Sequence, residues 1–509
     1  MDKRLNRRDF LNLLTLLPLL QIQRRASTFD SSRLPENSER PNVLILLFDT
    51  LSALHLPLHG YSRNTTPNLV RFAERATVFH QHYAAGNFTT PGTASLFTGT
   101  YPWTHRAFNL RGTVTSDFEH RNFFSISPTE VFTFAYSHNL LPVFLFQQFR
   151  EDLDLLKQTR ELSLVDNQYS DQVFPKDYNE SFWSEELMLR AESAQPGALF
   201  SSLAYRILRL LRKREIMKDS GSLFPRGIPN NFDIYYILED AIDWIIAELE
   251  GLPQPYLGYF HFMPPHAPYS PRHEFIGRFD DGYIPVSKPP SRFSQDKDEA
   301  LLLQRRQEYD EYIAYVDAEF GRLIDYLTRE GILDNTLVIF TSDHGESFER
   351  GILGHTTETL YEPVIRIPLI ISKPGQSQRQ DVFTPTSCID LLPTLLHLYG
   401  QEIPVWSEGG ILPTFGGQQV LSDRNIYIVE ARRNPKYGPI TKGTIALIHD
   451  QYKMIHYFGY DGEASEYELF NLSKDPEELE NLYSSEKSVA AALQDELLVK
   501  LDQVNQPFN

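Results

Sequence analysis

The chain has 509 residues, of which 67 are acidic and 48 basic, and its formal net charge is −19. An apolar content of 41% is typical of a packed globular protein, and the acidic excess argues against wholesale nucleic-acid binding, which depends on neutralising phosphates. A single cysteine, Cys388, excludes any internal disulfide and any cysteine-rich metal site.

The N-terminus is predicted to be a targeting segment over residues 1–27. The pair Arg7-Arg8 precedes Phe10 and a short apolar stretch, Leu13–Leu20, which resembles a twin-arginine export signal. A basic amphipathic helix lying on a membrane is the alternative. No clean cleavage site follows, so we expect an exported protein, periplasmic or lumenal, or one anchored to a membrane by the uncleaved segment. A polar linker is expected over residues 28–40.

Apolar strands then alternate with helical patterns. The first strand runs from Pro41 to Thr50 and stays apolar until Asp49, as expected for a strand that is buried on both faces. Further elements are expected at Ala76–Ala85 (strand and loop), Asp233–Leu249 (helix), Leu257–Met263 (strand), Glu299–Glu330 (helix), Thr336–Thr341 (strand) and Ile367–Ser372 (strand). This alternation predicts an α/β fold with a mostly parallel central sheet and ligands at the carboxyl ends of its strands.

The alternation gives way to aromatic- and charge-rich sequence between about residues 118 and 232. We interpret this range as an insertion that shapes the substrate pocket of a catalytic domain over residues 41–400. Within it, Tyr205–Arg214 is a basic amphipathic stretch. A solvated helix packed by its leucines is the simpler interpretation, and contact with a membrane surface or an anionic substrate is the alternative.

A smaller α+β subdomain is expected over residues 401–509. Its antiparallel strands are predicted at Ile426–Glu430, Thr444–His449, Tyr452–Phe458 and Tyr467–Leu472, with a closing helix from about Ser488.

Residues 89–99, Thr-Thr-Pro-Gly-Thr-Ala-Ser-Leu-Phe-Thr-Gly, are the most informative stretch. They resemble the nucleophile motif of the sulfatase family, within the alkaline phosphatase superfamily, which runs Cys/Ser-x-Pro-x-Arg, two spacers, Leu-x-Thr-Gly. Thr89 stands where the family carries the residue that is oxidised to formylglycine, and Thr93 stands where it carries arginine. Threonine cannot form that aldehyde, so the motif favours phosphoryl transfer over sulfate cleavage.

The local sequence also suits a nucleophile. Pro91 is typical of the first turn of a helix, which puts Thr89 near a helix N-terminus, where free N–H groups favour an oxyanion. An ordinary helix-capping threonine is the alternative interpretation.

The resemblance extends to a metal site. Asp49 matches the family's first metal carboxylate, with Thr50 in place of its usual second aspartate, and Asp343-His344 follows a predicted strand as the second metal pair does. With Thr89, these residues imply a site for one divalent metal, and oxygen and imidazole donors suit Ca, Mn or Zn. The middle Asp-x-x-x-His of two-zinc relatives is missing.

Other residues receive roles from the resemblance alone. His266, in a Pro-His-x-Pro-Tyr loop, is implied to protonate the leaving group, and His355 to contact the same oxygens. Asn109, Thr93 and His105 are implied substrate-binding residues. His138 and Asn139 remain further candidates.

Two later segments, Ile389–Leu396 and Tyr467–Leu482, also match the family. The resemblance implies a hydrolase of sulfuric or phosphoric esters, with a small-molecule, glycan or lipid-headgroup substrate and with peripheral membrane contact as an open option. A phosphoethanolamine- or phosphoglycerol-type transferase, or a non-catalytic binding protein, are the alternatives.

Overall fold

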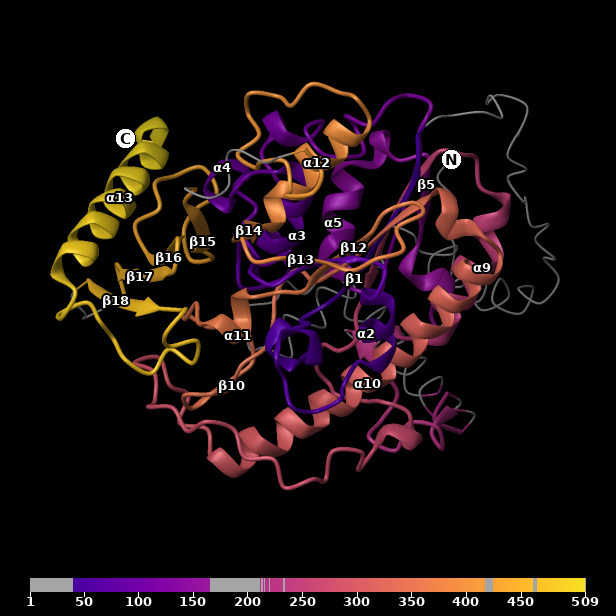
Figure 1. The fold of residues 1–509 in the computed structure, drawn as a ribbon, viewed down its shortest axis with the longest axis horizontal. Helices are drawn as coiled ribbons and strands as arrows, with labels where there is room; N and C mark the ends of the chain where they lie inside the picture. Colours follow the sequence, from indigo (N-terminus) through magenta and orange to yellow (C-terminus); the bar gives the residue numbers. More distant parts are fainter. Residues whose placement is uncertain are drawn as a thin grey trace, which may run out of the picture. The chain divides into compact units, whose positions relative to one another are not determined.

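The computed structural model describes residues 40–164, parts of 211–220, and residues 221–231, 234–416, 424–460 and 465–508. Its main sheet has eight strands in the order β13-β2-β12-β9-β1-β8-β4-β5. Four of these strands, β1, β5, β12 and β13, are labelled in Figure 1. The strands of this sheet are β1 (Asn42–Phe48), β2 (Thr77–Phe79), β4 (Phe132–Ser137), β5 (Leu155–Lys157), β8 (Tyr256–Phe262), β9 (Thr336–Thr341), β12 (Leu369–Ser372) and β13 (Gln380–Val382).

The central strand β1 pairs in parallel with both β8 and β9. In this register Leu47 lies opposite both His261 and Thr341. The carboxyl ends of the three strands therefore meet at one edge of the sheet. Strand β12 runs antiparallel to β9 and β2, so the sheet is mostly but not wholly parallel.

The two faces of β1 belong to two separate apolar cores. Val43, Ile45 and Leu47 pack with residues of α3, α5 and α12, whereas the alternate residues pack with α2, α9 and α10. The helices are α2 (Pro67–Ala73), α3 (Thr89–Thr98), α4 (Pro102–His105), α5 (Leu140–Gln148), α9 (Leu238–Glu248), α10 (Glu299–Arg329), α11 (Glu362–Ile365), α12 (Leu391–Leu398) and α13 (Lys487–Asn505). A strand covered by helices on both faces explains its uninterrupted apolar sequence.

The C-terminal residues form a second, antiparallel sheet in the order β15-β16-β17-β18. Its strands are β15 (Ile426–Glu430), β16 (Gly443–His449), β17 (Tyr452–Phe458) and β18 (Glu466–Asn471). Helix α13 contacts β16 and β17. Smaller two-stranded sheets pair β3 (His82–Tyr83) with β14 (Thr386–Ser387), β6 (Asn230–Asn231) with β7 (Ile234–Tyr235), and β10 (Phe348–Glu349) with β11 (Ile352–Leu353).

Two sequence-based expectations need correction. Strands β4 and β5 lie in the main sheet although they fall inside the range 118–232 that we expected to be an insertion; both are short, and the strand-forming aromatic residues of β4 were not recognised as a strand. Helix α9 begins at Leu238 rather than Asp233, since the preceding residues Ile234–Tyr235 form a strand. Aromatic and β-branched residues favour that extended conformation.

The targeting segment 1–27, the linker up to residue 39 and most of Tyr205–Arg214 lie outside the described residues. In the part of the chain that the structure describes, no helix is long and apolar enough to cross a membrane.

Candidate active site

The carboxyl ends of β1 and β9 bring two aspartates together. Asp49 follows β1, and Asp343 follows β9 after one intervening residue, Ser342. The Ser342 hydroxyl donates to the carbonyl of Phe48 at 2.7 Å and accepts from the N–H of Leu51 at 2.9 Å, which ties the two strand ends together. Both carboxylates are buried, with exposures of 0% for Asp49 and 1% for Asp343.

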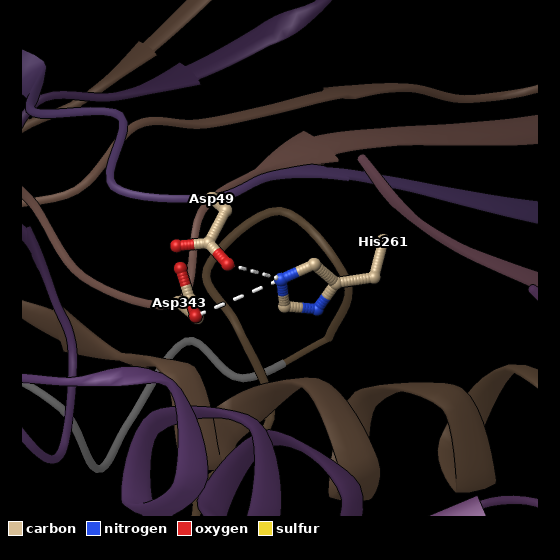
Figure 2. A group of neighbouring side chains, drawn as sticks. All are labelled: Asp49, His261 and Asp343. Atoms are coloured by element: carbon tan, nitrogen blue, oxygen red, sulfur yellow. Dashed lines mark hydrogen bonds and ion pairs between the residues drawn. The ribbon is translucent and has the colours of Figure 1, made fainter. Parts of the chain in front are cut away.

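His261, near the end of β8, completes a cluster with these carboxylates. Its Nε2 lies 2.9 Å from Asp49 Oδ2 and 3.8 Å from Asp343 Oδ2 (Figure 2). Its Nδ1 lies 2.9 Å from the Tyr259 hydroxyl, which fixes the ring. Potential ligand atoms of Asp49, His261 and Asp343 lie within 4.8 Å of one another. No sequence motif assigns a role to His261; its position near the end of an apolar strand was the available signal.

His344 faces the same carboxylates from the other side. Its Nδ1 donates to the carbonyl of Gly345 at 3.0 Å, so in the neutral ring Nε2 carries a lone pair. That Nε2 lies 3.5 Å from both Asp49 Oδ1 and Asp343 Oδ2. A lone pair so close to two carboxylate oxygens is repelled by them, and a cation between them would relieve this repulsion.

The charge state of the cluster fits a cation. Asp49 Oδ1 and Asp343 Oδ2 are buried without a hydrogen-bond partner among the described residues. Burial and the neighbouring Asp49 carboxylate raise the pKa of Asp343. Burial alone would do the same to Asp49, but the hydrogen bond from His261 and the nearby histidines hold its pKa below the usual range. Two buried carboxylates with unused oxygens, beside two imidazoles, form a donor set suited to a divalent metal.

Thr89 is the first residue of α3 and is 2% exposed. Its Oγ1 lies 3.4 Å from His344 Nε2, beside the cluster. Gly92 allows α3 to approach this closely, because a Cβ there would lie 2.4 Å from the carbonyl oxygen of Asp343. The helix N-terminus, with its free N–H groups, therefore lies directly against the two aspartates.

Asn139 links Thr89 to Asp49. Its Nδ2 lies 2.5 Å from Asp49 Oδ2 and 3.2 Å from Thr89 Oγ1. Its Oδ1 accepts from the N–H of Leu141 at 2.9 Å, which caps α5, and from Asn231 Nδ2 at 3.2 Å. Because both ends of the amide are held, the Nδ2 group stays directed at the cluster. From the sequence, Asn139 was predicted only as a further candidate for the site.

His266 and His355 lie at the outer side of the cluster. The ring centroid of His355 is 4.3 Å from that of His344 and 5.2 Å from that of His266. Its Nδ1 contacts Oε1 of the buried Glu346 at 3.0 Å. Glu346 thus orients His355, which packs on the predicted ligand His344, whereas His266 contacts His355 and its Nδ1 donates to the carbonyl of Ala267 at 2.6 Å.

The side chain of Thr50 is not directed at the carboxylates by any described contact. Its φ of 63° is left-handed, its N–H donates to Asp343 Oδ1 at 3.3 Å, and its carbonyl accepts from Tyr309. Its Oγ1 is buried without a hydrogen-bond partner in the described part of the chain. Thr50 therefore contributes its backbone to the site, and its unpartnered Oγ1 stays a predicted metal ligand.

Three predicted substrate-binding residues make other contacts. His105 is fully buried, contacts Ser95 Oγ at 2.9 Å and accepts from the N–H of Ala107, and burial lowers its pKa to about 3. The amide of Asn109 donates to the carbonyls of Arg432 and Asn434. Thr93 is buried further along α3. No described contact brings these side chains to Thr89.

Comparison with known proteins agrees with this geometry. The chain is 25% identical over 474 residues to a choline-sulfatase of Rhizobium meliloti (strain 1021), which covers 87% of this chain and 82% of that protein. The solved phosphonate monoester hydrolase of Agrobacterium radiobacter is 19% identical, with a TM-score of 0.63 over 91% of this chain and 96% of that one. A structure in complex with D-glucosamine-2-N,6-O-disulfate is 18% identical, with a TM-score of 0.61 over 91% and 97%. These neighbours confirm the expected alkaline-phosphatase-like α/β fold.

Family models cover most of the described chain. One described as N-sulphoglucosamine sulphohydrolase, C-terminal, matches residues 355–506. The model of the sulfatase family matches residues 41–127 and 191–401, so the unmatched range between them is shorter than the expected insertion. The chain therefore belongs to the sulfatase family, whose members hydrolyse ester bonds.

Proposed function

We propose that the protein is a metal-dependent hydrolase that cleaves phosphate esters or phosphonates in preference to sulfate esters, with Thr89 as its nucleophile. The observation that carries this proposal is the position of Thr89 Oγ1, which lies 3.2 Å from Asn139 Nδ2 and 3.4 Å from His344 Nε2 at the start of α3. Without a formylglycine hydrate, a threonyl sulfate has no elimination route and would have to be hydrolysed. A phosphothreonine needs the same hydrolysis, so the loss of the elimination route removes the advantage that sulfate esters have with formylglycine.

Asp49, Asp343 and His344 would hold one divalent cation, Ca, Mn or Zn, together with Thr89 and with His261 as an additional ligand. The two unpartnered carboxylate oxygens support this set. When bound, such a cation lowers the pKa of a coordinated hydroxyl and neutralises oxygens of the transferred group.

The side chains of the site divide the reaction between them. The ionised Oγ of Thr89 attacks phosphorus in line, so that the Oγ–P bond forms as the bond to the leaving oxygen breaks. His266 gives a ring proton to the leaving oxygen, while His355, oriented by Glu346, contacts the oxygens of the transferred group. Water then attacks the phosphorus of the phosphothreonine: its proton passes back to the His266 ring, the phosphate or phosphonate is released, and Thr89 Oγ leaves in the ionised form that began the cycle.

The substrate is proposed to be an ester of a small molecule or a glycan. Two similar proteins support this class of substrate: one is a choline-sulfatase, and the other was solved in complex with D-glucosamine-2-N,6-O-disulfate. A lipid headgroup is a further member of the same class, because it presents the same ester to the site.

The test is a rate comparison of the metal-loaded protein on 4-nitrophenyl sulfate, phosphate, a phosphodiester and a phosphonate. We expect kcat/KM to be higher for at least one phosphorus ester than for the sulfate. Faster turnover of the sulfate than of every phosphorus ester would overturn the substrate preference. A phosphorylated Thr89 that is stable without an acceptor would instead identify a transferase.

We also propose export through the twin-arginine route, because of Arg7-Arg8 and the apolar stretch that follows. Replacement of both arginines by lysine should leave the protein in the cytoplasm of an expressing bacterium. Unchanged export of that variant would remove the proposal.

A further inference from the structure

A cavity of about 500 Å³ opens beside the catalytic histidines. Its wall is formed by the His266 loop (Ala267, Pro268 and Tyr269), by Glu346, by residues Leu353–Thr356 and by Arg305 of α10. His355 belongs to this wall, and its ring also packs on His344 at 4.3 Å. The cavity is therefore connected to Thr89 through His355 and His344, whose Nε2 lies 3.4 Å from Thr89 Oγ1.

The two charged residues of the cavity wall, Glu346 and Arg305, differ in the contacts that they already make. Glu346 is buried, and its two oxygens already face the Nδ1 of His355 at 3.0 Å and the hydroxyl of Tyr269 at 3.1 Å. Arg305 is 44% exposed at the side chain, and its Nη1 donates to Glu308 Oε2 at 2.7 Å. A guanidinium has further N–H donors than the one used on Glu308, and exposed pairs of this type contribute little stability.

Most of the remaining wall is apolar, with Ala267, Pro268 and Leu353 among its members. Arg305 is the one permanently cationic residue among the residues that line this cavity. A cavity of this size accommodates a ring-sized group, and an arginine fork matches the geometry of a carboxylate or sulfate.

We propose that this cavity receives the leaving group and that Arg305 binds a second anionic substituent on it, a carboxylate or a sulfate. The preferred substrate is then an ester whose alcohol carries its own negative charge. This inference rests on the proposed hydrolase function, since it assigns the alcohol side of the same reaction. Arg305 sets specificity and takes no part in bond cleavage.

The test compares two reporter esters that share one transferred group. One releases 4-nitrophenol, and the other releases 5-hydroxy-2-nitrobenzoate, which carries a carboxylate. Arg305→Gln should lower kcat/KM for the carboxylated ester about 10- to 100-fold, the range expected for losing a charge-assisted hydrogen bond. The uncharged ester should change less than about 2-fold, which also shows that the variant is folded. Arg305→Lys should keep part of the preference.

The matched control is Arg329→Gln, which removes the same charge from the exposed far end of α10. It should leave both rates unchanged. Equal losses for the two esters in Arg305→Gln, or no loss for the carboxylated one, would overturn the role of Arg305 while the hydrolase function stands.

Binding of the free alcohols provides a measurement that does not need turnover. By calorimetry, 5-hydroxy-2-nitrobenzoate should bind wild type at least about 10-fold more tightly than Arg305→Gln, as one lost charged contact implies. The affinity for 4-nitrophenol should be the same in both proteins. If no reporter ester is hydrolysed, the proposed function fails, and this calorimetric comparison still decides whether Arg305 binds an anion.

Discussion

At the scale of single residues, the site depends on side chains held at both ends. Asn139 is the clearest case, because its Oδ1 caps α5 while its Nδ2 faces Asp49 and Thr89. One residue thus carries a structural role and a chemical role. Amino-acid substitutions at position 139 can separate the capping role from the proposed chemical role.

Asn139→Ser should separate them, because serine is also a good N-cap but cannot reach Thr89 with a donor. We expect kcat to fall on the order of 100-fold, as for loss of one preorganised donor, while the urea midpoint changes little. Asn139→Ala should lose the same activity and in addition about 1 kcal/mol of stability. Activity of Asn139→Ser close to wild type would contradict the chemical role.

His261 lies in the candidate metal site of the structure, although no role was predicted for it from the sequence. His261→Gln should weaken metal affinity about 10- to 100-fold, the range for losing a ligand or its supporting contact, measured by competition with a chelator. His105→Gln is the matched control, because that buried histidine contacts Ser95 and Ala107 instead of the carboxylates. Equal metal affinity in wild type and His261→Gln would exclude His261 from the site.

The sequence predicted Asp49, Asp343, His344 and Thr89 because each lies in a motif at the end of a strand or the start of a helix. Asn139 and His261 could not be ranked from the sequence, since their roles depend on strand order. Only the register of β1 with β8 brings His261 beside Asp49, and one sequence does not contain that register. His105 and Asn109 were taken from the family resemblance, which does not show which way a side chain points in this chain.

At the scale of elements, the close contact between α3 and the end of β9 decides the geometry of the site. The absence of a side chain at Gly92 makes that contact possible. Helix α3 is therefore placed by backbone packing against Asp343. Its position is set by sterics as well as by the apolar residues on its other face.

Gly92→Ala should destabilise the protein by about 1–3 kcal/mol, as overpacking does, although alanine is the better helix former. Activity should fall strongly because α3 and Thr89 must move. Gly251→Ala is the matched control, since nothing lies within 4 Å of a Cβ there. Urea midpoints and turnover of both variants decide the question; a Gly92→Ala protein as stable and active as wild type would contradict the packing argument.

At the scale of the whole molecule, several histidines are buried in neutral form far from the proposed metal ligands. Burial lowers the pKa of His82 to about 3 and of His456 to about 4, from an ordinary value of 6.5. Below pH 6.5 the unfolded chain binds protons that the folded chain does not. Stability is therefore fully present above about pH 6.5 and decreases as the pH falls toward 4, by up to about 1.4 kcal/mol per pH unit for each such group.

His456→Phe tests this dependence. His456 stacks between Tyr467 and Phe458, and neither ring nitrogen has a hydrogen-bond partner among the described residues. Phenylalanine should pack in its place and reduce the loss of stability between pH 7 and pH 5, measured by urea unfolding. A variant whose stability falls as steeply as that of wild type would show that His456 does not contribute.

The whole molecule also combines a sulfatase-family frame with a threonine at the reactive position. This frame consists of the strand ends, the N-terminus of α3 and the paired carboxylates. Sequence motifs predicted all three. The proposed preference for phosphorus over sulfur depends on one hydroxyl in that frame. Thr89 therefore carries the central claim.

Turnover of the best phosphorus ester by Thr89 variants is the most direct test of that claim. Thr89→Ala should reduce kcat/KM by about 1,000-fold or more, as removal of a covalent nucleophile does. Thr89→Ser should retain part of the activity because the hydroxyl remains, and mass spectrometry of wild type should find Thr89 unconverted. Thr89→Ala activity within about tenfold of wild type, with metal content unchanged, would contradict the account.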